Sequence, residues 1–286
     1  MASPHLLIFG LGYSGRAVAN LARRQGMAVS ATSRSVTKPQ ERDGVAMRPF
    51  AAPLPRDVTH VLATAAPGAA GDPVLATHAA ALRDLPGLRW AGYLSTTGVY
   101  GDRQGGWVDE TTPVAPGNAR SQSRVAAEQA WATLADRVAV DLFRVAGIYG
   151  PGRSALDDVR AGRARRVLQP GHAFGRIHVD DIAGAVLAAM GQALPPGVRV
   201  LHLADDVPAE NADVVAEAAS LLGLPAPEAV PFETAWAGMS DMARSFWAEN
   251  RKVRSVRTQE MLGYRWRYPS YREGLRGIKE ESSFSE

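Results

Sequence analysis

The sequence contains no cysteine, and only three of its 32 basic residues are lysines. The absence of cysteine excludes disulfide bonds, thiolate metal sites and a cysteine nucleophile. The scarcity of lysine makes an arginine less informative wherever lysine is the customary residue. Long apolar runs are also missing, because no stretch approaches the roughly 20 residues that a membrane-spanning helix needs.

The first ten residues hold a short apolar stretch without a basic flank, which does not fit a signal peptide. We therefore expect a cytoplasmic protein with no membrane partner. The formal net charge is only +3, and the arginine clusters at 163–166 and 251–257 accompany no nucleic-acid-reading motif. We therefore expect no nucleic-acid partner. A metal site is not expected either, because the histidines are isolated in the sequence.

A glycine motif follows the first predicted strand, with Gly10, Gly12 and Gly15 in the spacing GxGxxG. Gly10 permits a tight turn, Gly12 lets the backbone approach a pyrophosphate, and Gly15 lets helix and strand pack closely. Tyr13 and Ser14 fall in the first helical turn, whose free N–H groups attract phosphate. A merely flexible turn is the alternative, but the strand–turn–helix context favours a dinucleotide site.

The segment after the second predicted strand distinguishes NADP from NAD. An acidic residue there binds the ribose hydroxyls of NAD, whereas an arginine accommodates the 2′-phosphate of NADP. Here Ser33 stands at the acidic position, Arg34 follows it, and no carboxylate occurs before Glu41. Arg34 is able to stack on adenine and pair with phosphate, although an ordinary surface arginine is the alternative. NADP is therefore favoured over NAD.

Strands and helices alternate through the first half of the chain, which predicts a parallel sheet covered on both faces. The expected strands are 5–9, 29–32, 45–50, 60–66, 88–95, 138–145 and 198–204, and the expected helices are 16–24, 72–85, 121–135 and 181–190. The predicted fold is α/β, a Rossmann doubly wound parallel sheet with a smaller C-terminal α/β lobe. We assign 1–147 and 176–204 to an NAD(P)-binding domain, and 148–175 and 205–286 to a substrate-binding lobe. Thr64, Ala65 and Ala66 close the fourth strand and are included in the cofactor site.

Nearly the whole chain resembles the extended short-chain dehydrogenase/reductase superfamily, the NAD(P)-dependent epimerase/dehydratase proteins. Besides the glycine motif, the matching stretches are YLSTTGVYG (93–101), DETTP (109–113), RVAGIYGPG (144–152), RIHVDDIA (176–183), LGY (262–264) and the segment from YP (268–269) to GL (274–275). The match is to an atypical branch of that group.

The resemblance implies a catalytic Ser or Thr, a Tyr that exchanges the proton, and a Lys four residues later that binds the nicotinamide ribose. Thr96, four residues before Tyr100, takes the Ser/Thr position and would hold the substrate oxygen. Arg120 stands in the Tyr position and Arg124 in the Lys position. Both customary residues are therefore missing.

The two replacements have different consequences. Arg124 keeps the positive charge and is able to hydrogen-bond a ribose. Arg120 stays protonated at any working pH, so it cannot exchange a proton as a phenol does. An arginine pair suits anion binding, and a solvated helix surface is the alternative for both.

Other residues of the matching stretches are candidates for the substrate side. Tyr100, Tyr149 and His178 lie in stretches that approach the cofactor cleft in the family, although each also suits a packed, hydrogen-bonded role. Arg153 and Arg176 are candidates for binding an anionic substrate. The predicted site therefore combines Thr96, Arg120, Arg124 and Tyr100 with Tyr149, Arg153, Arg176 and His178.

The leading hypothesis is an NADP(H)-binding oxidoreductase, epimerase or dehydratase that acts on a small hydroxylated or nucleotide-linked substrate as a monomer or homodimer. The missing tyrosine keeps a second hypothesis open, a catalytically degenerate NADP(H)-binding sensor or regulatory protein. A structural subunit that binds nothing is a third, which the intact glycine motif argues against. Fold alone does not decide among them.

Overall fold

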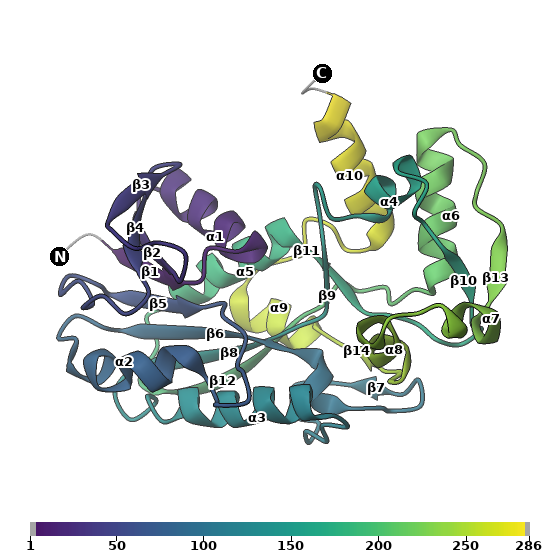
Figure 1. Cartoon of the computed structure of the whole chain (residues 1–286). Coiled ribbons are helices and arrows are strands. Elements are labelled where there is room, and N and C mark those ends of the chain that lie inside the picture. The colour runs from purple at the N-terminus through teal and green to yellow at the C-terminus, as the bar shows by residue number, and fades with distance from the viewer. Residues whose placement is uncertain (1–3, 284–286) are drawn as a thin grey trace.

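A computed structural model describes residues 4–283, and its largest feature is an eight-stranded sheet in the order β12-β8-β6-β5-β1-β2-β4-β3 (Figure 1). The strands are β1 (His5–Phe9), β2 (Ala28–Ser33), β3 (Gln40–Arg42), β4 (Val45–Pro49), β5 (His60–Ala63), β6 (Trp90–Thr96), β8 (Ala139–Val145) and β12 (Gly197–Leu203). All neighbours pair in parallel except β3 with β4. The strand order reverses between β1 and β5, which is the topology of a doubly wound sheet.

Helices cover both faces of this sheet, as the alternation of strands and helices predicts. On one face lie α1 (Tyr13–Arg24) and α5 (Val179–Met190), which pack against each other. On the other face lie α2 (Pro73–Asp84) and α3 (Ala119–Ala132), at the lower edge of Figure 1. The predicted doubly wound α/β fold is confirmed.

Side chains of β1 pack in two separate hydrophobic cores because successive strand residues point to opposite faces of the sheet. Leu6 and Ile8 pack in the cluster that includes α1 and α5, whereas Leu7 and Phe9 pack in the cluster that includes α2 and α3. All five residues of β1 are buried. A strand buried on both faces accounts for the continuous apolar run in the sequence.

The smaller lobe is built around three helices, α4 (Ala155–Arg160), α6 (Asn211–Leu222) and α10 (Tyr271–Ser283), which share their own hydrophobic cluster. The remaining elements are the 3-10 helix η1 (Thr97–Tyr100), β7 (Trp107–Val108), β9 (Gly147–Tyr149), β10 (Arg166–Leu168), β11 (Arg176–His178), β13 (Ala229–Pro231), α7 (Phe232–Ala237), α8 (Asp241–Trp247), β14 (Lys252–Val253) and α9 (Val256–Leu262). A smaller C-terminal α/β lobe is thus confirmed.

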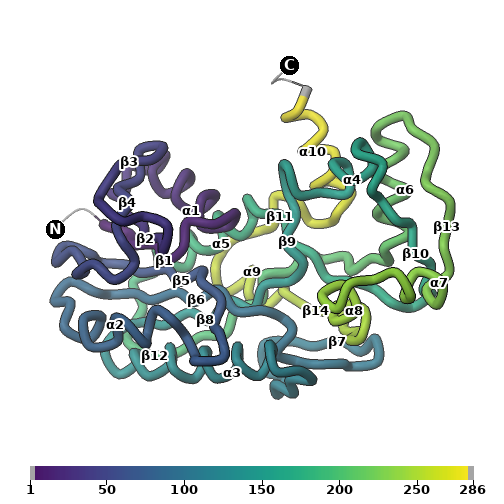
Figure 2. The backbone as a smooth tube through the Cα atoms, viewed as in Figure 1, coloured from purple at the N-terminus to yellow at the C-terminus, as the bar shows by residue number. Residues whose placement is uncertain are grey.

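The chain returns to the sheet before it ends in the lobe (Figure 2). β14 pairs with β7, and α9 packs against α5 and β12, whereas α10 packs against α6. The exact division of the chain into two domains stays a prediction.

Several boundaries differ from the predicted ones. The first helix begins at Tyr13 rather than at residue 16, and the fourth strand ends at Ala63, so Thr64 lies in the loop that follows it. Strands of two or three residues, such as β9 and β11, were not predicted because they are too short to show a period of two.

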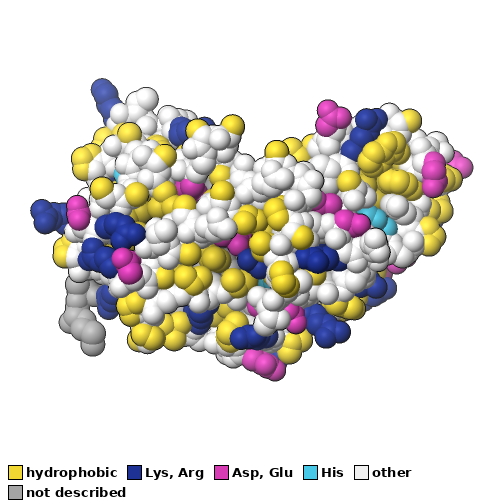
Figure 3. Space-filling view, turned by 90° about the horizontal axis from the view of Figure 1, so that it is seen from below, with side chains coloured by type: hydrophobic (Ala, Val, Ile, Leu, Met, Phe, Trp, Pro, Cys, Tyr) yellow, Lys and Arg dark blue, Asp and Glu magenta, His cyan; other side chains and the backbone are white. Residues whose placement is uncertain are grey.

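The molecular surface seen from below mixes side chains of all kinds (Figure 3). On this face the basic side chains are scattered among hydrophobic and acidic ones and do not gather in one patch. Within residues 4–283, we find no helix with the length and apolar character needed to cross a bilayer.

Candidate functional site

The turn between β1 and α1 has the geometry that its glycines predict. Gly10 adopts φ +100°, and a Cβ there would lie 2.8 Å from Thr64 Oγ1. A Cβ on Gly15 would lie 2.5 Å from the carbonyl oxygen of Gly10, so only glycine allows helix and strand to pack this closely. A Cβ on Gly12 would meet no atom of the described residues within 4 Å. The space above Gly12 is therefore open at the start of α1, where the helix N–H groups favour an anion.

A cavity of about 550 Å³ lies beside this turn, at the carboxyl ends of β1, β2 and β5. It is lined by Gly10, Leu11, Gly12, Thr32, Ser33, Arg34, Ser35, Phe50, Thr64, Ala65, Ala66 and Pro73. None of these described residues is acidic. Arg34 is exposed and forms no ion pair with any residue between 4 and 283. The structure thus brings together seven of the residues predicted for cofactor binding.

Tyr13 and Ser14 occupy the first turn of α1. The Tyr13 hydroxyl donates a hydrogen bond to the Pro151 carbonyl (3.0 Å), and the Arg153 guanidinium lies 5.8 Å from the centre of its ring. Burial raises the pKa of Tyr13 to about 12. Ser14 is buried in the same turn. Tyr13 therefore connects the glycine turn to the loop after β9.

Thr96 ends β6 and lines a second cavity of about 360 Å³. Its Oγ1 accepts a hydrogen bond from the Gly98 N–H (3.1 Å), which caps η1. Tyr149 and Arg176 line the same cavity. Thr96 ends β6 of the large sheet, whereas Tyr149 and Arg176 belong to the separate two-stranded β9–β11 sheet, so the cavity joins Thr96 to residues at least 53 positions away.

The two arginines at the Tyr and Lys positions are held away from this cavity. Arg124 donates from Nη1 to the Tyr93 hydroxyl (3.0 Å) and to the Leu94 carbonyl (2.9 Å). Arg120 is exposed on α3 and donates to the Met242 sulfur of α8 (2.8 Å). Neither arginine is among the residues that line the second cavity.

Tyr100 is fully buried, and its hydroxyl belongs to a core network. It accepts a hydrogen bond from Arg144 Nη1 (2.7 Å) and contacts His202 Nε2 (2.5 Å). His202 Nδ1 donates to the Arg254 carbonyl, so Nε2 is left to accept from the Tyr100 hydroxyl, which also lies within donating distance of the Asp109 carbonyl (3.1 Å). Burial raises the pKa of Tyr100 to about 12. The structure therefore places this hydroxyl in the core rather than in the cleft.

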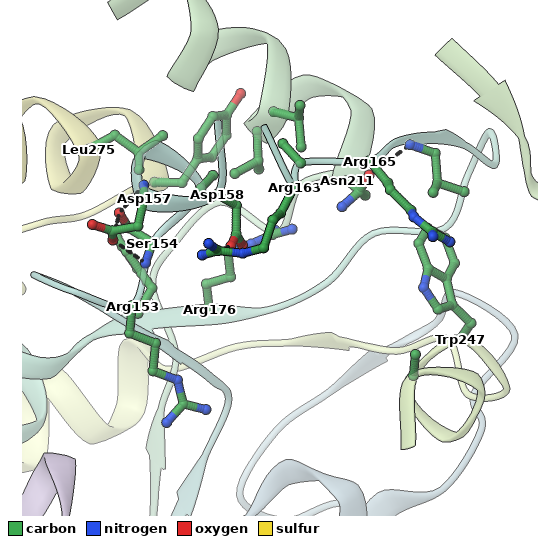
Figure 4. Close-up of a pocket in the computed structure, with 18 of the residues that line it drawn as sticks. Arg153, Ser154, Asp157, Asp158, Arg163, Arg165, Arg176, Asn211, Trp247 and Leu275 are labelled. Carbon is green, nitrogen blue, oxygen red and sulfur yellow. Dashed lines mark hydrogen bonds and ion pairs between the residues drawn. The ribbon is translucent and has the colours of Figure 1, made fainter. Parts of the chain in front are cut away.

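A third cavity of about 840 Å³ lies in the smaller lobe and is rich in arginine (Figure 4). Arg163 pairs with Asp158 (3.1 Å), whereas Arg165 extends toward the side where Trp247 lies. Arg176 donates to the Phe174 and Ala209 carbonyls (both 2.9 Å), and burial lowers its pKa.

Arg153 and Tyr149, the other two substrate-binding residues predicted for the lobe, differ in the cavities they line. Arg153 belongs to this third cavity, but its side chain points away from the middle (Figure 4). Tyr149 lines both the second and the third cavity, and its hydroxyl donates to the Ser270 carbonyl (3.4 Å). Burial raises the pKa of Tyr149 above its usual range.

His178 lies between aromatic rings instead of facing these cavities. Its ring centre is 4.1 Å from that of Tyr268 and 5.2 Å from that of Tyr149. Nδ1 accepts a hydrogen bond from the Asp180 N–H (3.2 Å), which caps α5. Burial lowers the pKa of His178 to about 4, so its ring is neutral near pH 7.

Three residues at or next to the second cavity were missed by the sequence analysis: Glu249 and Arg251 line it, and Asn118 contacts Glu249. Asn118 caps the N-terminus of α3, and its Nδ2 donates to Glu249 Oε1 (3.0 Å). Arg251 Nη1 donates to Glu249 Oε2 (2.6 Å). Glu249 and Arg251 lie in an irregular segment without periodicity, so no local signal indicated them. Between residues 4 and 283, no group of three or more His, Cys, Asp or Glu side chains is arranged to hold a metal ion.

This sheet order, the glycine turn and the C-terminal lobe define the chain as having the fold of the extended short-chain dehydrogenase/reductase superfamily, which confirms the predicted resemblance. The chain belongs to one family with a conserved protein of unknown function from Silicibacter pomeroyi DSS. The two are 42% identical with a TM-score of 0.87, over 98% of this chain and 99% of that one.

More distant solved structures share the fold alone. The human epimerase family protein SDR39U1, solved with NADPH, is 19% identical with a TM-score of 0.76, over 96% of this chain and 99% of that one. A UDP-galactose 4-epimerase is 17% identical with a TM-score of 0.72, over 97% of this chain and 99% of that one.

The curated relatives are similar over part of their length. Protein YeeZ of Escherichia coli K12 is 36% identical over 141 residues, which are 48% of this chain and 47% of that protein. A 3-diazoavenalumate denitrifying reductase from a Streptomyces species is 31% identical over 147 residues, 47% of this chain and 45% of that protein. The chain thus spans about half the length of the curated relatives it matches. No family model matches the chain.

Proposed function

We propose that the protein is an NADP(H)-dependent oxidoreductase of the epimerase/dehydratase type that acts on a small hydroxylated, anionic or nucleotide-linked substrate. The observation that carries the proposal is the 550 Å³ cavity, which joins the open face of Gly12 to Ser33 and Arg34. The open face leaves room for a pyrophosphate, and the described residues that line the cavity offer an arginine and no carboxylate to a ribose 2′-phosphate.

The bound cofactor would be held along the carboxyl edge of the sheet. Gly10, Gly12 and the N-terminus of α1 would hold the pyrophosphate, and Arg34 the 2′-phosphate. The nicotinamide half would then extend past Thr64 toward Thr96, because the ligand crosses the point where the strand order reverses. When bound, the nicotinamide supplies hydride transfer.

The substrate would occupy the second and third cavities, where Tyr149 and Arg176 are common to both. Thr96 would hold the reacting oxygen. Arg165 and Arg176 would attract an anionic group, and the Trp247 ring offers a face for a flat one. The NADPH bound by the human epimerase family protein and the sugar nucleotide named for the galactose epimerase are in keeping with this reading.

Arg34 provides the first test of cofactor choice. We expect Arg34→Gln to weaken NADPH binding about 10- to 100-fold, because a phosphate–guanidinium pair is lost, with NADH binding changed less than about twofold. Titration of each nucleotide followed by protein fluorescence measures both constants. Arg42→Gln, on the exposed edge strand β3, is the matched control. Equal binding of NADPH and NADH by the unaltered protein would remove the role given to Arg34, and binding of neither would overturn the proposed function.

A cofactor sensor is the second candidate, favoured by one observation. Arg120 and Arg124 are engaged by Met242 and by Tyr93 and Leu94, so neither supplies the customary proton chemistry. A sensor would bind NADPH tightly and change its oligomeric state on binding, as sedimentation would show. Consumption of NADPH with any carbonyl substrate would instead establish an enzyme.

A further inference from the structure

The cavity beside Thr96 lacks the customary tyrosine but contains a carboxylate. Among the described residues that line it, Glu249 is the only acidic one. Its side chain is 11% exposed, so it is largely withdrawn from bulk water while it still borders the cavity. A carboxylate is a common general acid or base, whereas a guanidinium is not.

The Glu249 carboxylate is held against the start of α3, the helix whose first turn contains Arg120. The Asn118 side chain, which caps this helix through the Ser121 N–H (2.9 Å), donates to Oε1 at 3.0 Å. A Cβ on Gly117 would lie 3.1 Å from the same oxygen, so the carboxylate packs closely on the turn.

Arg251 holds the second carboxylate oxygen. Its Nη1 donates to Glu249 Oε2 (2.6 Å) and to the Gly101 carbonyl (2.9 Å), which ties the pair to the loop after η1. The Arg251 side chain is 16% exposed and also borders the cavity. Both oxygens of Glu249 are thus oriented by side chains from two different parts of the fold.

We propose that Glu249 exchanges the proton that accompanies hydride transfer, in place of the missing tyrosine, and that Asn118 and Arg251 position it. This inference rests on the proposed function. In the oxidising direction, the O–H bond of the substrate breaks and its proton passes to a Glu249 oxygen. The C–H bond of the carbon that bears this oxygen breaks, its electron pair leaves with the hydrogen as hydride to the oxidised nicotinamide dinucleotide, and the electron pair of the O–H bond forms the carbonyl. The protonated Glu249 then returns the proton to solvent.

The tyrosines of the matching stretches are less suited to this step. The Tyr149 hydroxyl donates to a carbonyl, and the Tyr100 hydroxyl is buried between Arg144 and His202. Burial raises the pKa of both phenols. Glu249 borders the cavity with an oriented carboxylate, and it requires no rearrangement of the core.

The test uses the charge of the cofactor, because NADP⁺ carries a positive nicotinamide ring and NADPH a neutral one. A carboxylate near the ring favours NADP⁺, and a nearby guanidinium disfavours it. We expect Glu249→Gln to raise the Kd of NADP⁺ about three- to tenfold and to change the Kd of NADPH less than twofold. Arg251→Gln should move the ratio of the two constants in the opposite direction. Glu233→Gln, on the exposed helix α7, is the control that leaves the ratio unchanged.

Thermal melts of each variant confirm folding. If Glu249→Gln does not fold, Glu249→Asp takes its place. This variant keeps the charge and should retain the ratio of the NADP⁺ Kd to the NADPH Kd of the unaltered protein. The same variants are assayed for NADPH oxidation with phenanthrenequinone as the probe carbonyl. Loss of the carboxylate should lower kcat about 10²- to 10⁴-fold with the KM for NADPH nearly unchanged. If the unaltered protein does not reduce this probe, the affinity ratio alone decides.

The outcomes separate the two proposals. A ratio that stays constant in Glu249→Gln and in Arg251→Gln would overturn the role of Glu249 while leaving the proposed function intact. Failure of the unaltered protein to bind either nucleotide would overturn the proposed function itself. Opposite shifts in the two variants would support the assignment, because a purely structural role moves both affinities together.

Discussion

Gly12→Asp is expected to weaken NADPH binding by at least about 100-fold without lowering the thermal midpoint of the protein. A Cβ at Gly12 meets no atom of residues 4–283 within 4 Å, so the folded protein accepts a side chain there. The same open space is where a pyrophosphate would approach the N-terminus of α1, and a carboxylate placed in it repels the phosphates and blocks them. Fluorescence titration and a thermal melt measure the two effects separately.

Gly15→Ala is the control, because it is expected to lower the thermal stability of the protein. Its Cβ would lie 2.5 Å from the Gly10 carbonyl oxygen, so helix and strand must move apart and stability must fall. If Gly12→Asp binds NADPH as the unaltered protein does, the cofactor does not lie over the glycine turn.

Arg144→Met is expected to lower the free energy of unfolding by about 3–5 kcal/mol, because it leaves the Glu128 carboxylate buried without its partner. The two side chains are 8% and 5% exposed, and Arg144 donates from Nε and Nη2 to Glu128 at 3.1 Å and 2.7 Å. Glu128 also accepts from Ser95, next to Thr96, and Arg144 also donates to Tyr100. Urea unfolding followed by circular dichroism measures the change.

The ion pair of Arg83 and Asp136 is a matched control at the surface, with side chains 39% and 61% exposed. Arg83→Met should cost no more than about 1 kcal/mol, because water and salt screen an exposed pair. The double variant Arg144→Met with Glu128→Leu should recover much of the loss, since no charge is then left unpaired. A cost for Arg144→Met as small as that for Arg83→Met would contradict the buried-pair interpretation.

The sequence by itself determined the sheet and the glycine turn. A strand such as β1, buried on both faces, requires an unbroken apolar run, and the GxGxxG motif forms its turn within six consecutive residues. These features depend on residues that are adjacent in the sequence, so they are predictable without a structure. The match of short motifs over nearly the whole chain likewise indicated the fold, which the strand order confirms.

Local motifs did not determine which way a side chain faces. The stretch that contains Tyr100 is typical of a cofactor cleft, yet its hydroxyl contacts Arg144 and His202, from two other strands, and the Asp109 carbonyl. His178 similarly caps α5 from within an aromatic cluster. Whether a polar group meets solvent or core depends on residues that are distant in the sequence, which no local pattern contains.

The lining of the cavity beside Thr96 was decided by the tertiary structure alone. Glu249 meets Asn118 across 131 positions, in a segment whose composition and spacing carry no periodic signal. Only the return of the chain through β14, which pairs with β7, brings Glu249 and Arg251 to the edge of the sheet near Thr96. The physical reason is that the glycine turn is built from adjacent backbone groups, whereas the cavity is lined by side chains that only long-range packing places together.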